Sequence, residues 1–342
     1  MDIIIALIPI LLLLILLFFV KLSALKSSIL ALVITCVITM FYHSYALNRE
    51  GILNATTHGM LIAFIAAYVL FFGLLLYQLL DSVNGIQLIS DYLTELTEDK
   101  ILQMLILITG FSPLLESTSG FGIAFMIIAP LLLSIGFSPY KAIMIALVSL
   151  LAVPWGALAT GTVIGAELAQ ISLINLGVGT SILSLPVFFY FIFLALMIAG
   201  GKAALKEKWL EATIFSVIFA VGIFIFNKYL SVELSGVLTA LIEILVGFVI
   251  IHRKKYKSAK TKSLKPKAVI KIFIPYAFLT LSIFVSRTVT PIKEVLKNHL
   301  VIQVEKYNFR LELLYSPAFW LFLTCIPLSI RIVVVRYFSV IV

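Results

Sequence analysis

Long apolar runs separated by short polar segments recur along the whole chain. Their lengths lie near the roughly 20 residues that a helix needs to cross about 30 Å of hydrocarbon. Apolar runs of this length predict membrane-spanning helices. The predicted helices cover residues 3–20, 28–47, 59–80, 139–158, 181–199, 211–228, 233–251, 272–287 and 315–335.

Residues 101–136 depart from this pattern. Two apolar arms, residues 101–111 and 123–136, flank the polar stretch Glu-Ser-Thr-Ser-Gly-Phe-Gly at 116–122. Each arm is shorter than a full span, and together they are too long for one straight helix. The pattern therefore predicts a broken helix or a re-entrant hairpin. Backbone that leaves the helix at membrane depth needs protein or a water-filled cavity to satisfy it, and transporters bind substrate at such breaks.

The composition sets the broad class. Hydrophobic residues make up 62% of the chain and charged residues only 12%, which excludes a soluble globular domain. We predict an all-α polytopic membrane protein with about nine transmembrane helices plus the hairpin. The first run follows Asp2 instead of a positive charge, so we interpret it as a retained helix and not a secretory signal. Cys36 and Cys325 lie inside apolar runs and indicate neither a disulfide nor a metal site.

Charge is concentrated in one loop, residues 252–271. Nine basic residues and no acidic residue lie between Arg253 and Lys271, so this loop carries the whole net charge of +9. Lysine and arginine accumulate on the cytoplasmic side of membranes. Counting helices from this loop places the N-terminus outside and the C-terminus inside. Because the loop is short and its only aromatic residue is Tyr256, we interpret it as a topology signal with anionic lipid contact and not as a nucleic-acid site.

The polar stretch of the hairpin offers chemistry for an anion and a proton. A carboxylate deep in the bilayer is costly unless it faces a cavity, has a partner or is protonated, so Glu116 is the candidate proton-coupling residue. If residues 123–136 form a helix, its N-terminal amides and dipole point at the break and favour an anion. Glycine at 120 and 122 lets backbone approach a small ligand. Two alternatives remain open: a structural acid at 116, and glycines that serve helix packing.

A second polar interruption follows at residues 154–167. Pro154 lacks an amide donor and should kink its helix, which frees backbone groups that Thr160 or Thr162 can satisfy or offer to a ligand. Elsewhere, Glu243 lies in the middle of a predicted helix, and we consider a pairing with Arg287.

At these residues the sequence resembles the lactate permease family. Members of that family carry a run like Asp-Arg-Arg, then Leu-Glu-Gly-Ala-Ala-Gly-Phe-Gly, a Gly-Phe-x-Pro turn and a Phe-Gly-Ala element. Here the corresponding segments are Glu-Asp-Lys at 98–100, Leu-Glu-Ser-Thr-Ser-Gly-Phe-Gly at 115–122, Gly-Phe-Ser-Pro at 136–139 and Trp-Gly-Ala at 155–157. Four elements in the right order over about 70 residues make a specific resemblance.

The resemblance implies a secondary transporter that carries L-lactate, glycolate or related 2-hydroxy monocarboxylates with protons across the cell membrane. It implies no enzymatic activity and no cofactor, and the chain has no His-Glu-x-x-His or Gly-x-Ser-x-Gly motif. The substrate-binding candidates lie in the two polar interruptions: Ser117, Thr118, Ser119, Gly120, Phe121, Gly122, Trp155, Gly156, Thr160 and Thr162.

The departures from the family pattern also matter. The small triplet after the acid is Ser-Thr-Ser instead of Gly-Ala-Ala, so the preferred substrate can differ from lactate, and coupling to H⁺ or Na⁺ stays open. Family members are longer and carry a second hairpin, Gly-Ser-Asp-Thr-Ser-Ser-Asn, that has no counterpart here. We therefore expect an inverted-repeat transporter with an incomplete second repeat: residues 1–251 as the first repeat and 272–342 as the start of a truncated second part. The alternative is a truncated or split, non-transporting subunit that requires a partner half.

Overall fold

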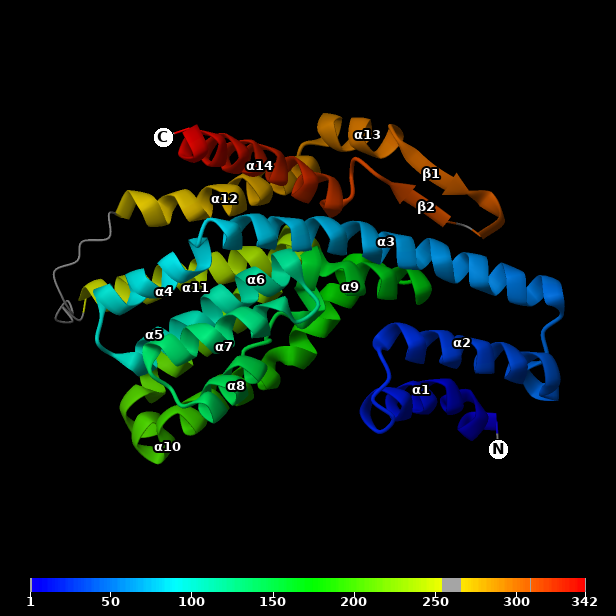
Figure 1. The fold of residues 1–342 in the computed structure, drawn as a ribbon, viewed down its shortest axis with the longest axis horizontal. Coiled ribbons are helices and arrows are strands. Elements are labelled where there is room, and N and C mark those ends of the chain that lie inside the picture. The colour runs from blue at the N-terminus through cyan, green and yellow to red at the C-terminus, as the bar shows by residue number, and fades with distance from the viewer. Residues whose placement is uncertain (1, 254–265, 308, 342) are drawn as a thin grey trace. The chain divides into compact units, whose positions relative to one another are not determined.

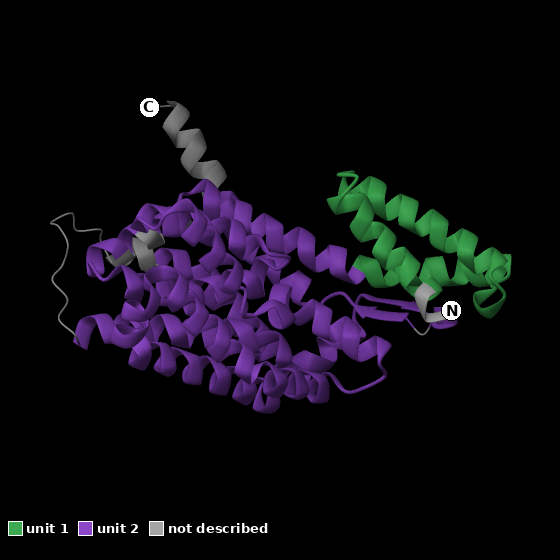
Figure 2. Cartoon of the chain, turned by 90° about the horizontal axis from the view of Figure 1, so that it is seen from below, with its two compact units in different colours: residues 1–64 green, residues 65–342 purple. Residues whose placement is uncertain are grey.

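The computed structural model describes residues 2–253, 266–307 and 309–341, and these residues are mostly helical (Figure 1). The chain divides into two compact units, residues 1–64 and 65–342 (Figure 2). The first unit holds α1 (Asp2–Phe18), α2 (Ala24–Phe41), the short 3₁₀ turn η1 (His43–Tyr45) and the first part of α3 (Arg49–Ser82). Helix α2 begins earlier than predicted because Ser23 caps it, accepting a hydrogen bond from the amide of Lys26 at 3.4 Å.

The second unit contains the rest of α3 and all later elements. A short β-hairpin, in which Val301 pairs with Glu312, and α13 lie between the predicted helices 272–287 and 315–335. The elements of this unit, in chain order, are α4 (Gly85–Leu96), α5 (Lys100–Ile106), η2 (Leu107–Phe111), α6 (Ser112–Ser119), α7 (Ile123–Ile135), α8 (Pro139–Val148), η3 (Val153–Trp155), α9 (Gly156–Leu168), α10 (Leu173–Tyr229), α11 (Val232–Arg253), α12 (Pro266–Thr288), α13 (Thr290–Asn298), β1 (Val301–Val304), η4 (Glu305–Tyr307), β2 (Phe309–Glu312) and α14 (Pro317–Ile341).

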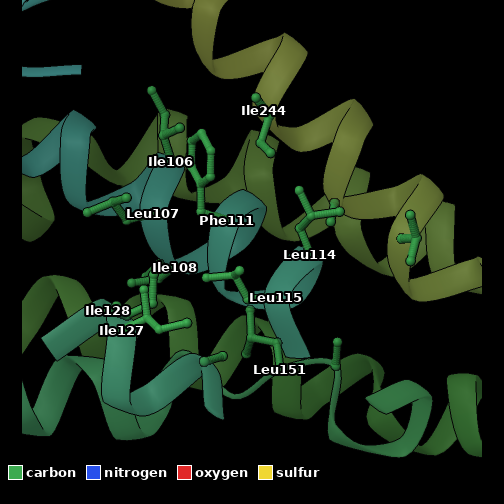
Figure 3. Close-up of a cluster of buried hydrophobic side chains, with 14 of the residues drawn as sticks. Ile106, Leu107, Ile108, Phe111, Leu114, Leu115, Ile127, Ile128, Leu151 and Ile244 are labelled. Atoms are coloured by element: carbon green, nitrogen blue, oxygen red, sulfur yellow. The ribbon is translucent and has the colours of Figure 1, made fainter. Parts of the chain in front are cut away.

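The centre of the second unit is the continuous arm α5–η2–α6. Almost every residue of Lys100–Ser119 is buried, and α7, α9, α10 and α11 pack around this arm. Figure 3 shows its apolar side chains, among them Ile106 and Phe111, in one cluster with Ile128 of α7 and Ile244 of α11. A helix so enclosed by protein is shielded from lipid, so the backbone at its end can depart from helical geometry.

Residues 100–136 form a helical hairpin, as predicted, but its first arm, Lys100–Ser119, is a continuous 20-residue helix long enough to cross a membrane and not the short arm expected from the sequence, and a re-entrant path stays a prediction. Its two arms, α5–α6 and α7, pack against each other, and the chain reverses between them at residues 120–122. The ends of the arms also meet, because a Cβ on Gly136 would lie 2.8 Å from Nζ of Lys100. Helix α7 has 13 residues and so measures about 20 Å, less than the roughly 30 Å of hydrocarbon.

The number of predicted spans is not confirmed. Among the described residues, five helices are long and apolar enough to cross a membrane, or up to seven if each bent pair counts as one span. The predicted helix 139–158 is divided into α8 and the η3–α9 segment, which are bent by 60°. The predicted helices 181–199 and 211–228 both lie within α10, which is interrupted at Gly201 and Lys208. The inverted repeat stays a prediction, and residues 254–265 of the basic loop lie outside the described residues.

Candidate functional site

Two segments of non-helical backbone meet in the second unit. At the hairpin tip, Gly120, Phe121 and Gly122 have φ of 69°, 55° and 78°. In α9, residues 157–159 have φ of 36°, 53° and 62°, so three more consecutive residues are left-handed. A Cβ on Gly120 would lie 2.9 Å from the backbone nitrogen of Ala157. This close approach is open only to glycine, so the tip of the hairpin is fitted against the break in α9.

Glu116 lies between these two breaks. Its side chain is 1% exposed, and its Oε1 accepts a hydrogen bond from the backbone N–H of Gly122 at 3.2 Å. The amide of Ala124 also points at this carboxyl group. On the other side, a Cβ on Gly156 would lie 3.2 Å from Oε1. The amides and the dipole at the N-terminus of α7 therefore act on the side chain of Glu116 itself, at the position where the sequence predicts that an anion is favoured.

The three hydroxyl residues after Glu116 have different surroundings. The Oγ of Ser117 is buried beside Gly236 of α11 and has no hydrogen-bond partner in the described part of the chain. Thr118 donates its hydroxyl to the carbonyl of Leu114 at 2.9 Å, and Ser119 is buried against α3. Phe121, at the tip, is 61% exposed. Of this group, the hydroxyl of Ser117 is the polar atom that most needs a partner.

The second interruption satisfies its own backbone, which is one of the two alternatives that the sequence leaves open. Thr160 donates to the carbonyl of Ala157 at 2.8 Å, and Thr162 donates to the carbonyl of Pro154. The indole N–H of Trp155 is donated to Oδ1 of Asn227 in α10 at 3.0 Å. Trp155 is fully buried, so in this structure its side chain anchors the turn that precedes Gly156.

Two hydrogen-bonded contacts that hold the breaks in place were not predicted from the sequence. Asn227 holds Trp155, and Ser112 holds the end of α8 through a contact of 2.8 Å between its Oγ and that of Ser149. Each is a small polar residue inside an apolar run. Asn227 is an amide side chain within the predicted membrane helix 211–228. Because buried polar groups need partners, its position could have marked it as a structural residue.

A cavity of about 230 Å³ opens beside the second break. Leu158, Thr160 and Glu167 line it together with Glu233, Arg287 and Tyr315. The Nε of Arg287 donates to Oε1 of Glu233 at 3.1 Å, and its guanidinium stacks on the ring of Tyr315 at 3.5 Å. The suggested pairing of Arg287 with Glu243 is therefore wrong, because α12 places the guanidinium beside the first turn of α11 and not its middle.

A second charged cluster lies at the other end of the hairpin. Asp99 caps α5 by accepting the amide of Leu102 at 3.0 Å, and it forms an ion pair with Lys208. Lys141 donates to the carbonyl of Ala199 at 2.8 Å. This cluster joins the base of the hairpin to the interrupted part of α10. Within the described residues, no group of three or more His, Cys, Asp or Glu side chains is arranged to hold a metal ion.

Comparison with known proteins decides the family. The family model for L-lactate permease matches residues 2–339, nearly the whole chain. The chain belongs to the L-lactate permease family. This is a family of membrane transporters and not of enzymes.

Curated relatives of this L-lactate permease family member agree with the assignment. The glycolate permease GlcA of Escherichia coli (strain K12) is 27% identical over 70% of this chain and 43% of its own length. L-lactate permeases of Streptococcus iniae and Halalkalibacterium halodurans are 27% and 24% identical over 75% and 82% of the chain, and 54% and 56% of their own lengths. The chain thus spans about half the length of the curated relatives that it matches. No solved structure matches it.

Proposed function

We propose that this protein carries a small 2-hydroxy monocarboxylate, such as L-lactate or glycolate, together with a proton across the cell membrane. The family and the names of its relatives support the substrate class. The proposal is supported chiefly by the position of Glu116, a buried carboxyl group that accepts a hydrogen bond from the backbone N–H at the N-terminus of α7. A substrate carboxylate has the same chemistry and would bind the same amides.

Competition for these amides couples the proton to the substrate. A protonated Glu116 is neutral and accepts hydrogen bonds more weakly than a carboxylate. Protonation therefore releases the N–H groups of Gly122 and Ala124, and an incoming carboxylate replaces the side chain there. In this proposal the 2-hydroxyl group is received by the hydroxyl of Ser117, which is buried without a partner among the described residues, and by that of Thr160. The proton frees the amides for the substrate, and the substrate carboxylate takes the hydrogen bonds that favour an ionised Glu116. Substrate and proton therefore enter the site together.

The substrate-binding residues in this proposal are those of the two breaks. Access is through the cavity lined by Leu158 and Thr160, whose volume of about 230 Å³ equals that of roughly seven or eight water molecules. This is sufficient for lactate, which has six non-hydrogen atoms. The proposed binding set is Ser117, Thr118, Ser119, Gly120, Phe121, Gly122, Trp155, Gly156, Thr160 and Thr162, with Glu116 as the proton-coupling residue.

We also propose that the N-terminus lies outside and the C-terminus inside. The charged cluster at Asp99, Lys141 and Lys208 then lies on the cytoplasmic side, in agreement with the lysine-rich loops. The cavity beside Arg287 and Glu167 then opens to the outside, where an incoming substrate meets it first.

Uptake of labelled L-lactate tests the function. The chain is expressed alone in cells that lack their own lactate carriers, and a proton gradient is imposed. We expect gradient-dependent accumulation above the empty-vector level, and we expect Glu116→Gln to abolish it while the protein still inserts in the membrane. Glu294→Gln, the same change at an exposed acid of α13, should leave uptake unchanged. Full uptake by Glu116→Gln with an unaltered pH dependence would remove Glu116 from the mechanism, and no uptake by the wild type would contradict the proposed function.

A further inference from the structure

A second buried acid lies on α11, which packs against the same hairpin arm. Glu243 is in the middle of α11 and is 0% exposed. Neither of its carboxyl oxygens has a hydrogen-bond partner of ordinary geometry among the described residues. Oε1 of Glu116 has a backbone N–H donor and its Oε2 has no partner among the described residues, whereas neither oxygen of Glu243 has a donor. A buried charge without a partner is strongly disfavoured, so Glu243 carries its proton in this conformation.

The surroundings of Glu243 are apolar and tightly packed. A Cβ on Gly110 would lie 2.5 Å from Cγ1 of Ile244, and one on Gly247 would lie 2.5 Å from Cγ1 of Ile106. Figure 3 shows Ile106, Phe111 and Ile244 side by side at this contact. Helix α11 therefore packs closely on the hairpin arm within one turn of Glu243.

The part of the arm that faces Glu243 is the π-helical turn η2. The polar group there is the hydroxyl of Thr109, which donates to the carbonyl of Leu105 at 2.9 Å. With its proton used in this way, the Thr109 oxygen is left as an acceptor for the O–H of a protonated Glu243. Single π-helical turns inside α-helices are frequent at functional sites, and they are places where a helix can change its register.

Charged groups on the elements around α11 all have other surroundings. Burial and the Thr109 hydroxyl act on Glu243, and no charged side chain in the described part of the chain does so. The partnered or buried charges on the packed elements are Lys100 beside Gly136, Glu116 at the start of α7, Lys208 and Glu211 near Asp99, Glu167 at the cavity, and Arg287 with Glu233. Of the others, Lys202, Lys206, Glu207 and Lys271 are exposed, and Lys228 lies over the ring of Phe224. Glu243 therefore titrates only if the packing around it changes.

We propose that Glu243 is a second proton-binding carboxyl group of the transport cycle. It is protonated while α11 is packed on η2, and it releases its proton to water when the hairpin arm moves away from α11. No other bond forms or breaks in this step. The role in coupling rests on the proposed function, because the hairpin that binds substrate at its tip is the same arm that covers Glu243.

Infrared spectroscopy of the reconstituted full chain tests the protonation state without any transport. We expect the C=O stretching band of a protonated carboxylic acid at neutral pH, lost in Glu243→Gln and retained in Glu116→Gln. Added L-lactate should shift or remove this band, because it moves the arm. A difference spectrum between wild type and Glu243→Gln that contains only carboxylate bands would overturn the proposal, whether or not the chain transports lactate.

Transport measurements then separate coupling from folding. For Glu243→Gln, we expect the ratio of gradient-driven uptake to lactate counterflow to fall by a factor of roughly 5 to 150, the usual size of a coupling between two binding sites. Thr239→Val is the matched control, since Thr239 is a buried polar residue one turn earlier in α11 with an unpartnered hydroxyl. An unchanged ratio in Glu243→Gln would overturn the role in coupling, and no counterflow in the wild type would instead contradict the proposed function.

Discussion

The two breaks that form the site both have positive φ angles, but they are built from different residues. Each has three consecutive residues with positive φ, and the two segments touch. The hairpin tip uses Gly120 and Gly122, with Phe121 exposed to the surroundings. The break in α9 uses Ala157, Leu158 and Ala159, none of them glycine and all buried. A left-handed conformation costs roughly 1–2 kcal/mol for each residue that has a Cβ.

The difference shows that the local sequence favours the backbone geometry of the hairpin tip, where two of the three residues are glycine, but not that of the break in α9. Glycine adopts the geometry of the tip at little steric cost. The break in α9 is strained, and such strain persists only where the surrounding structure imposes it. The contacts that impose it are the approach of Gly120, the Thr160 and Thr162 hydroxyls, and the tie between Trp155 and Asn227. Strain of this kind is typical of segments that change conformation in function.

Gly120→Ala should have the largest effect. Gly120 has φ 69° and ψ −171°, a region that is almost restricted to glycine, and an added Cβ would lie 2.6 Å from that of Ala157. Backbone strain and overpacking together should destabilise the fold by about 2–5 kcal/mol. Thermal unfolding of the purified protein in detergent measures this loss.

Gly161→Ala is the control for this substitution. Gly161 lies in α9, and an added Cβ there meets nothing within 4 Å. We expect its unfolding temperature to equal that of the wild type or to exceed it, since alanine favours a helix over glycine by about 1 kcal/mol. If both variants unfolded at the wild-type temperature, the close contact between the two breaks would be wrong.

Asn227→Leu should cause the next largest loss of stability. It removes a contact that holds the strained break in α9 and leaves the hairpin tip unchanged. The substitution leaves the indole N–H of the fully buried Trp155 without an acceptor, which costs about 1–3 kcal/mol. Thermal unfolding again gives the measurement. The double variant Trp155→Phe with Asn227→Leu removes both partners, so it should lose less stability than the two single variants added together. Strict additivity would show that this hydrogen bond does not hold the break.

The sequence predicted the break at the hairpin tip well and the break in α9 only in part. The run 116–122 contrasts with its apolar flanks and contains two glycines, so its position follows from composition. In the second element the prediction rested on Pro154, and the kink there is present. The left-handed residues, however, begin three positions later, at Ala157. Nothing in Ala-Leu-Ala indicates this conformation, because the contacts around it, among them that of Gly120, come from residues far away in the sequence.

The sequence predicted which charged groups belong to the site, but not which residues they contact. An anion at the N-terminus of α7 follows from helix physics, but the sequence could not show that Glu116 itself reaches back to this position. Likewise, Glu243 and Arg287 were both recognised as intramembrane charges. Only the packing of α12 on α11 shows that Arg287 pairs with Glu233 and leaves Glu243 alone. The pattern of apolar residues predicts how deep in the membrane a residue lies, whereas tertiary contacts determine which residue it pairs with.

Ala159→Gly should have the smallest effect, and it isolates the strain. Glycine relieves the left-handed strain at Ala159, about 1–2 kcal/mol, but it loses a buried methyl group worth about 0.8 kcal/mol and adds about 0.4–1 kcal/mol of unfolded-state entropy. These terms nearly cancel. Ala166→Gly changes a buried residue of ordinary helical geometry in the same helix. This variant loses the methyl group and gains unfolded-state entropy, but it relieves no strain. Thermal unfolding should therefore place Ala159→Gly about 1–2 kcal/mol above Ala166→Gly in stability. Equal losses in the two variants would mean that residues 157–159 hold no strain, and the contrast between the two breaks would then be one of sequence alone.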